Sequence, residues 1–238
     1  MTRLSIVMPV LNEAEGLPAT LQALSALRQR GVELIVVDGG STDDTAALAA
    51  AAADRVLAGP AVPRGRARQM NAGAAVAQGD VILFLHADTL LPPDADALIA
   101  QALVQGARWG RFDVCICGGA ALFPVIAALM NWRSRLTGIA TGDQALFVER
   151  KLFTTLGGYA DQPLMEDIEI SRRLRAVARP ACLRARVQTS GRRWLQHGVW
   201  RTVLLMWRLR WRYWRGESPE SLARAYRGRV AGQRLRSR

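Results

Sequence analysis

The chain has 238 residues, half of them hydrophobic, so it can bury a sizeable core as one larger domain or as one domain with an appendage. Its formal net charge of +12 invites a nucleic-acid-binding interpretation. However, residues 1–190 hold 19 Lys and Arg against 18 Asp and Glu, whereas residues 191–238 hold 13 Arg against 2 Glu, so the basic character belongs to the tail. Three cysteines without paired spacing indicate neither a disulfide framework nor a zinc site, and they suit a reducing cytosolic setting.

Short apolar segments alternate with helical patterns along the body of the chain. Strand patterns cover residues 4–10, 34–38, 55–58, 81–88, 111–116 and 145–149. Helical patterns lie between the first four of these, near 94–104, and over 164–177. Continuous apolar strands separated by helices predict an α/β fold up to about residue 190, with a mostly parallel central sheet that helices cover on both faces.

Two apolar stretches bear on membranes and secretion. The N-terminal run LSIVMPV has only seven residues and leads straight into polar motif residues, unlike a signal peptide, so we expect no secretion. The stretch Val114–Trp132 carries no charge over 19 residues, roughly the length of a membrane span. Because it contains Gly118, Gly119 and Pro124, a buried or interface helix is favoured over a span.

Polar residues follow three of the predicted strands, at the edge where open α/β sheets bind their ligands. In LIVVDGGSTDDT, Ser41 and Asp44 resemble a capping box that opens the next helix. The box does not explain Asp38, whose carboxylate lies before the turn and can accept hydrogen bonds from a ribose or a base. A capped helix and a nucleotide site both fit this turn, and no G-x-G-x-x-G or P-loop pattern occurs in the chain.

The segment GRARQMNAGAAVAQGD brings Arg66, Arg68 and Asn71 to the start of a predicted helix. Backbone N–H groups and cationic side chains at such a place favour a diphosphate. A solvated helix end explains the same residues equally well.

In FLHADT, His86 and Asp88 alternate on a chain that we expect to be extended, so both would point to one face. Mg²⁺ and Mn²⁺ prefer oxygen ligands and commonly take one or two carboxylates plus substrate phosphates. Asp88 meets that need, and a residue that caps the following segment is the alternative.

The segment PLMEDIEIS gathers Glu166, Asp167 and Glu169 near a helix start. Acids in a first turn complement the helix dipole. Adjacent carboxylates beside apolar residues also suit a general base, because desolvation and like charge raise the pKa. The spacing is compatible with both roles.

Taken together, in this order and spacing, the segments PVLNE, VVDGGSTDDT, RQMNAGA, FLHADT, GDQALFV, GGY and MED resemble the inverting family 2 glycosyltransferases of the GT-A fold. The resemblance covers roughly residues 3–178, about three quarters of the chain. It looks closest to a bacterial subgroup of small enzymes, some of which are labelled carotenoid-acid glycosyltransferases.

The resemblance implies a nucleotide-sugar donor, with a UDP-sugar favoured, and a divalent ion, Mn²⁺ or Mg²⁺. For the nucleotide sugar it implies Pro9, Asn12, Glu13, Asp38, Ser41, Arg66 and Asn71. For the ion it implies Asp88, together with His86, which stands where the family's Asp-X-Asp motif usually has its first acid. On the acceptor side it implies Asp143 and Gln144.

For the reaction, the resemblance implies Asp167 as the base, with Glu166 beside it. The base would deprotonate an acceptor hydroxyl or carboxyl group as that group attacks the anomeric carbon, and the configuration would invert in one displacement. The ion would stabilise the departing nucleoside diphosphate. The expected acceptor is a small or lipid molecule such as a carotenoid acid or a polyprenyl compound.

The tail predicts an amphipathic helix through Val199–Arg215. One face carries Trp200, Val203, Leu204, Trp207, Trp211 and Trp214, and the adjacent stripe carries Arg201, Arg208, Arg212 and Arg215. Tryptophan beside arginine is favoured where lipid headgroups meet acyl chains, so we expect a cytoplasmic protein attached to the inner face of the cell membrane. The alternatives are tryptophans packed on the catalytic domain or a second subunit, and a surface that binds nucleic acid by stacking.

The combined prediction is a metal-dependent hexosyltransferase with one GT-A domain at 1–190, a basic helical tail at 191–238 and no nucleic-acid partner. A nucleotidyltransferase on the same type of sheet is the alternative enzyme, and MED near residue 166 argues against it. A non-catalytic membrane or nucleic-acid adaptor would leave the acids of the body unexplained.

Overall fold

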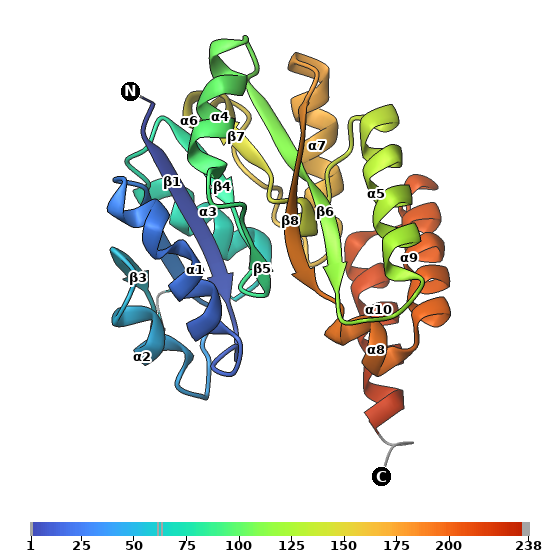
Figure 1. Cartoon of the computed structure of the whole chain (residues 1–238). Coiled ribbons are helices and arrows are strands. Elements are labelled where there is room, and N and C mark those ends of the chain that lie inside the picture. The colour runs from blue at the N-terminus through green and yellow to red at the C-terminus, as the bar shows by residue number, and fades with distance from the viewer. Residues whose placement is uncertain (1, 61, 63, 235–238) are drawn as a thin grey trace.

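The computed structural model describes residues 2–60, 62 and 64–234 as an eight-stranded sheet with helices on both faces (Figure 1). The strands are β1 (Leu4–Val10), β2 (Glu33–Asp38), β3 (Arg55–Leu57), β4 (Val81–Phe84), β5 (Thr89–Leu90), β6 (Trp109–Cys117), β7 (Phe147–Glu149) and β8 (Ala181–Ser190). The helices are α1 (Leu17–Gln29), α2 (Thr45–Ala50), α3 (Arg66–Val76), α4 (Ala95–Val104), α5 (Phe123–Thr137), the short 3₁₀ turn η1 (Gly142–Gln144), α6 (Arg150–Thr155), α7 (Glu166–Val177), α8 (Arg192–His197), α9 (Val199–Trp214) and α10 (Pro219–Arg234).

The first half of the sheet is parallel, in the order β3-β2-β1-β4. Its strands are continuous apolar runs because helices cover both of their faces. The register pairs Val10 with Asp38, so β1 and β2 end at the same level. Pro9 removes no ladder bond toward β4, because β4 ends opposite Val7.

The second half of the sheet is mixed. β7 runs antiparallel between β4 and β6, β6 is parallel to β8, and β5 closes the edge antiparallel to β8. The expected α/β class with helices on both faces is confirmed. β8 was not among the predicted strands, although its strict alternation of Leu183, Ala185 and Val187 with polar residues is a strand signal.

Two hydrophobic clusters fill the two sides of the sheet. On one side, Ile6 and Met8 of β1 pack with Leu24 of α1 and Phe112 of β6. On the other side, Val7 of β1 packs in a second cluster with residues of α3, α6 and α7. The side chains of β1 alternate between the clusters because successive residues of a strand face opposite ways. This core holds the ends of β1, β2 and β4 at one edge of the sheet.

The C-terminal helices pack against the body through a third cluster. Leu209 of α9 and Leu222 of α10 are buried with Met165, which directly precedes α7. The uncharged stretch that begins at Val114 divides between β6 and α5 (Figure 1), and α5 has one buried and one exposed face. Within the described part of the chain, no helix has the length and apolar character needed to cross a membrane.

Candidate active site

The loops that follow β1 and β2 form one hydrogen-bonded unit. Asp38 is buried, and its carboxylate accepts the backbone N–H groups of Gly40 and Ser41 at 3.0–3.2 Å as well as the Ser41 hydroxyl. Asn12, at a positive φ of 53°, donates its N–H to Ser41 Oγ at 2.9 Å and accepts the Thr42 N–H at 2.8 Å. These bonds fix a polar, preformed turn where a nucleotide was predicted to bind.

The capping box predicted for Ser41 and Asp44 is wrong. α2 begins at Thr45, and its N-cap residue Asp44 makes no side-chain capping bond. The Ser41 hydroxyl goes to Asp38 instead, because a buried carboxylate needs hydrogen-bond donors. Asp43 accepts the N–H of Thr45 at 3.1 Å and its hydroxyl, and the hydroxyl bond in particular holds the pKa of Asp43 below its usual value.

Glu13 connects this unit to the tail. Its N–H donates to Thr45 Oγ1 at 2.8 Å, and its carboxylate lies 3.4 Å from the Arg192 guanidinium of α8. The same guanidinium lies 3.4 Å from Glu15. α8 therefore touches the loop that follows β1.

The helix α3 reaches this edge with amides and cations. Gln69 is buried, and its Nε2 donates to the carbonyls of Val10 at 2.9 Å and Val37 at 2.8 Å, which ties α3 to the ends of β1 and β2. Arg66 is nearly half exposed and lies 4.0 Å from the Glu166 carboxylate. Sequence reasoning missed Gln69, which lies in the quoted segment RQMN.

Asn71 and Arg68 use their side chains within the protein. The Asn71 amide donates to the carbonyl of Tyr159 at 2.8 Å and accepts the N–H of Tyr159 at 2.9 Å. Arg68 forms a bidentate pair with Asp161 at 2.6 and 2.8 Å on the surface. Both bonds anchor the segment that leads into α7.

His86 and Asp88 lie in a turn, so the predicted extended conformation is wrong. β4 ends at Phe84, and the Thr89 N–H closes the turn on the His86 carbonyl at 3.1 Å. His86 is buried, its Nδ1 lies 3.4 Å from Asp143 Oδ1, and its ring packs on Gly142, where an added Cβ would lie 2.4 Å from Cε1. The carboxylate of Asp88 is half-buried, with the Thr89 hydroxyl 3.5 Å away.

Asp143 and Gln144 of η1 differ in exposure. Asp143 is 42% exposed and faces His86, whereas Gln144 is fully buried. Gln144 forms a reciprocal capping box with Thr141, and its amide donates to Asn131 Oδ1 at 3.3 Å. Gln144 therefore fixes the turn that presents Gly142 and Asp143.

Asp167 lies at the start of α7, where Met165 adopts a positive φ of 67°. Its carboxylate accepts the N–H of Gly142 at 3.0 Å and that of Ile168 at 2.8 Å. Burial, followed by the charge of the buried Glu166, raises the pKa of Asp167 from 3.8 to about 7, against the opposing effect of the two hydrogen bonds. The carboxylate can therefore take up or release a proton near neutral pH.

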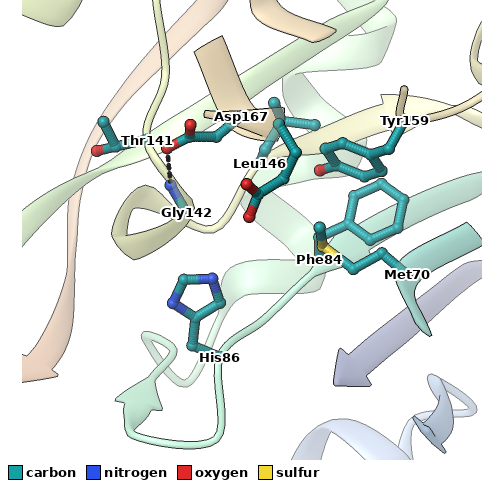
Figure 2. A pocket seen from close by; sticks show the side chains of 9 residues that line it. Met70, Phe84, His86, Thr141, Gly142, Leu146, Tyr159 and Asp167 are labelled. Atoms are coloured by element: carbon teal, nitrogen blue, oxygen red, sulfur yellow. Dashed lines mark hydrogen bonds between the residues drawn. The ribbon is translucent and has the colours of Figure 1, made fainter. Parts of the chain in front are cut away.

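A small cavity joins these elements, and Figure 2 shows Gly142 between the Asp167 carboxylate and the His86 ring. Its lining comes from α3, β4, the turn around η1, the segment at Tyr159 and α7. Sequence reasoning missed Met70, Phe84, Thr141, Leu146 and Tyr159. Tyr159 and Thr141 belong to the quoted GGY motif and the turn before GDQ, which were the available signals. The volume is about 10 Å³, close to that of one water molecule, so a substrate would meet these residues at the rim.

The side chains present suit a divalent ion that takes some of its ligands from the protein and the others from a substrate. No three His, Cys, Asp or Glu side chains are arranged to hold an ion by themselves within residues 2–60, 62 and 64–234. The Asp88 carboxylate and the imidazole that faces Asp143 nevertheless provide hard and borderline ligands, and Mg²⁺ or Mn²⁺ readily takes its other ligands from phosphate oxygens.

Fold and site together define an α/β enzyme. Its polar residues lie at the carboxyl ends of parallel strands, and one acid of the site, Asp167, has a pKa raised to about 7. The chain belongs to Glycosyl transferase family 2, whose profile matches residues 5–151. It is a glycosyltransferase. Asp167 lies beyond the matched residues, so the family match does not bear on it.

Several curated relatives are glycosyltransferases. An uncharacterized glycosyltransferase of Mycobacterium tuberculosis is 32% identical over 189 residues, which cover 76% of this chain and 71% of the relative. A PGL/p-HBAD biosynthesis glycosyltransferase of Mycobacterium bovis is 38% identical over 169 residues, 65% of this chain and 62% of the relative. An undecaprenyl-phosphate 4-deoxy-4-formamido-L-arabinose transferase of Aeromonas hydrophila is 34% identical over 110 residues, 43% of this chain and 34% of the relative.

Solved structures share the fold. The TarS 1–349 fragment of S. aureus in complex with UDP superposes with a TM-score of 0.63 at 17% identity, over 79% of this chain and 60% of that chain. Glucosyl-3-phosphoglycerate synthase from Mycobacterium tuberculosis, in complex with Mn²⁺, UDP and phosphoglyceric acid, gives 0.58 at 23% identity, over 79% of this chain and 69% of that chain. The expected GT-A architecture is confirmed, and this chain spans less than two thirds of the length of the TarS fragment and of the M. bovis relative.

Proposed function

We propose that the protein is an inverting, metal-dependent hexosyltransferase in which Asp167 is the base. The observation that carries this proposal is the Asp167 carboxylate, held by the Gly142 N–H at 3.0 Å with its pKa raised to about 7. A base with a pKa near the working pH combines a large unprotonated fraction with a useful affinity for the proton. Glu166 supports this role through its charge.

In the proposed reaction, an acceptor hydroxyl or carboxyl oxygen attacks the anomeric carbon of the sugar. The new carbon–oxygen bond forms as the bond to the nucleoside diphosphate breaks, and Asp167 takes the acceptor proton. Attack from the side opposite the leaving group inverts the anomeric configuration. Gly142 holds the carboxylate still, which reduces the cost of orienting the base.

The donor we propose is a UDP-sugar, bound along the loops that follow β1 and β2. Pro9, Asn12, Glu13, Asp38 and Ser41 form or flank that preformed turn, and Arg66 and Asn71 lie on the neighbouring helix α3. Arg66 is exposed enough to meet a diphosphate, whereas Asn71 would act through the segment at Tyr159. The solved structures of TarS and of glucosyl-3-phosphoglycerate synthase that contain UDP support this choice of donor.

For the ion we propose Mn²⁺ or Mg²⁺, held by Asp88 and His86. When bound, the ion supplies positive charge that stabilises the departing diphosphate. Asp143 lies 3.4 Å from His86 Nδ1 and would orient the ring, as carboxylates beside metal-bound histidines do. On the acceptor side we propose Asp143, whose side chain is 42% exposed, with buried Gln144 fixing the turn that carries it.

We propose a lipid or small-molecule acceptor, such as a polyprenyl compound or a carotenoid acid, met at the inner face of the cell membrane. Trp200, Trp207, Trp211 and Trp214 of α9 are 55–81% exposed, so they do not pack on the described body of the protein. Exposed Arg201, Arg208 and Arg215 flank them. Tryptophan beside arginine suits a headgroup layer, and the undecaprenyl-phosphate transferase relative supports a lipid acceptor.

The test of the reaction is a panel of nucleotide sugars with Mn²⁺ or Mg²⁺, in which release of nucleoside diphosphate is measured. Wild type is compared with Asp167→Asn, and Asp94→Asn is the matched control because Asp94 is exposed and makes no side-chain capping bond. We expect loss of turnover only in Asp167→Asn. Equal turnover by all three proteins would remove Asp167 as the base, and no nucleotide sugar bound by wild type would end the proposal.

The membrane test uses Trp207→Ser with Trp211→Ser, because both rings are exposed. Deletion of the tail is less informative, since it would also expose Met165 beside Asp167. We expect wild type to co-sediment with anionic vesicles and the double variant to stay in the supernatant with an unchanged melting temperature. Salt-sensitive binding to DNA without binding to vesicles would favour the nucleic-acid interpretation.

A further inference from the structure

The guanidinium of Arg133 on α5 is buried, and it has no hydrogen-bond partner among the residues that the structure describes. Its Nε and both terminal nitrogens are shielded from solvent and make no hydrogen bond to the residues that the structure describes. A guanidinium keeps its charge at any physiological pH, so it cannot escape the cost of burial by losing its proton. An unpaired buried charge is among the most expensive features a fold can carry.

Two neighbouring charges act on Arg133, and one of them, Arg111, is itself paired with Asp113. Arg111 adds a like charge, whereas Asp167 is the acid whose attraction acts on Arg133. No ion pair between Arg133 and Asp167 lies within 4.0 Å among the described residues, so the five donors of the guanidinium point to a missing acceptor.

The place of Arg133 separates it from the donor loops. α5 packs on β6, and β7 and β4 lie between β6 and β1 in the sheet. The residues proposed for the nucleotide follow β1 and β2 and lie on α3, whereas Arg133 acts on Asp167 from the β6 side. In Figure 1, α5 stands on the opposite side of the molecule from β3 and α2. An anion at Arg133 would therefore approach the base from the acceptor side.

The outer face of α5 is apolar. Val125, Leu129, Trp132 and Leu136 are 54–65% exposed and recur at helical spacing. The same helix thus presents an apolar stripe to its surroundings and a buried cation toward the base. An acceptor with an apolar chain and an anionic end matches both features.

We propose that Arg133 binds an anionic oxygen group of the acceptor, a phosphate or a carboxylate, beside Asp167. The planar fork of a guanidinium accepts two oxygens of such a group at once. This inference rests on the proposed glycosyl transfer and narrows its acceptor to molecules that carry an oxyanion in addition to the hydroxyl group whose proton passes to Asp167. Arg133 makes and breaks no covalent bond in this role, because it only holds the acceptor.

The experiment measures binding of acceptor analogues in detergent micelles without any sugar donor. The probes are a polyprenyl phosphate, the corresponding neutral polyprenol, a long-chain polyene carboxylic acid and inorganic phosphate. The proteins are wild type, Arg133→Met, Arg133→Lys and the control Arg172→Met, which removes an exposed arginine from α7. The affinity for UDP is measured in parallel.

We expect Arg133→Met to weaken binding of the preferred anionic probe about ten- to a hundredfold, the range for a lost charge-assisted hydrogen bond. Arg133→Lys should recover part of the loss, and Arg172→Met should bind like wild type. Affinity for UDP should not change in any variant. Comparing the affinities for the polyprenyl phosphate and the polyene carboxylic acid then shows whether the group is a phosphate or a carboxylate. Comparing the polyprenyl phosphate with inorganic phosphate shows whether the lipid chain is needed.

Four results would overturn the inference. They are equal binding of polyprenol and polyprenyl phosphate, anion binding by Arg133→Met at wild-type strength, loss of UDP affinity in that variant, and a wild type that binds none of the anions. If Arg133→Met does not fold, Arg133→Lys decides the outcome, since it keeps the charge but not the fork. Arg133-dependent anion binding in a protein that turns over no nucleotide sugar would support the site while ending the proposed transfer.

Discussion

The two halves of the sheet treat their polar side chains differently. After β1 and β2, Asp38, Asn12 and Gln69 use their polar atoms on the backbone of neighbouring loops. Toward β6, Arg133 is buried without a hydrogen-bond partner among the described residues, and Arg186 of β8 is exposed. These side chains of the first half are bonded before a ligand arrives, whereas the second half buries one guanidinium that is left without a hydrogen bond to the described residues. Asp167 lies between them, at the cavity beside His86.

The sharpest test of this division is the base itself. Asp167→Asn keeps the shape of the side chain but cannot take a proton, so kcat should fall about 10²- to 10⁴-fold. Binding of UDP should change little, because the donor loops hold themselves together without Asp167. Steady-state kinetics and nucleotide titration check both parts. Loss of UDP affinity together with kcat would show that donor binding also depends on Asp167, against the division of the site into two independent halves.

The pH dependence follows from the same carboxylate. Since the base must be unprotonated, kcat/KM of wild type should rise with pH up to about 7 and then level off. The stability of the folded protein should change with pH in the opposite direction. The folded protein keeps a proton on Asp167 that the unfolded chain has lost, so stability should fall as pH rises from 3.8 to about 7. Unfolding in denaturant at pH 5 and pH 8 should show a smaller difference for Asp167→Asn than for wild type.

Gly142→Ala tests the position of Gly142, which packs on the His86 ring and donates its N–H to Asp167. An added Cβ would lie 2.4 Å from His86 Cε1, so the ring or the turn has to move. Activity should fall about 10- to 100-fold, as it does when the support of a metal-binding histidine is disturbed. Gly16→Ala is the matched control, since nothing lies within 4 Å of its Cβ position. Wild-type activity in Gly142→Ala would show that the position of His86 is unimportant.

Asn71→Leu probes the completed half through stability. The change leaves the N–H and the carbonyl of Tyr159 without their partners, which should cost about 1–3 kcal/mol in the free energy of unfolding. Gln22→Leu removes an exposed amide and should leave stability nearly unchanged. Urea unfolding of both variants measures the difference. Equal effects would mean that the Tyr159 contacts contribute nothing specific.

The smallest expected effect concerns the tail. Arg201 and Arg208 are exposed beside the tryptophans of α9, and each cation near an anionic surface contributes about 1 kcal/mol, roughly fivefold in binding. Arg201→Gln with Arg208→Gln should therefore weaken vesicle binding more at low salt than at high salt. Arg172→Gln on α7 is the control. If neither the two substitutions nor the salt concentration changes vesicle binding, the arginines do not contribute, and binding would have to come from the tryptophans.

Much of the candidate site is predicted from residue type and order. The sequence alone predicts three parts of the candidate site. They are the strand that ends in Asp38, the strand that ends near Asp88, and the adjacent acids Glu166 and Asp167. The sequence could not show that Asn71 and Gln144 turn their amides inward, because their partners lie 88 and 13 residues away. It also did not show the turn at His86, since an apolar strand pattern carries no sign of where the chain bends.

By itself, the sequence determined the α/β class, the membership in family 2 and the residue types at the strand ends, because periodicity and order are local properties. Only the tertiary structure decided which carboxylate has a raised pKa and which cation lacks a hydrogen-bond partner among the described residues. Asp167 owes its raised pKa to burial beside Glu166, and the Arg133 guanidinium is shielded by its packing without a hydrogen-bond acceptor among the described residues. Burial and the supply of partners depend on what packs nearby, and that is a property of the folded chain.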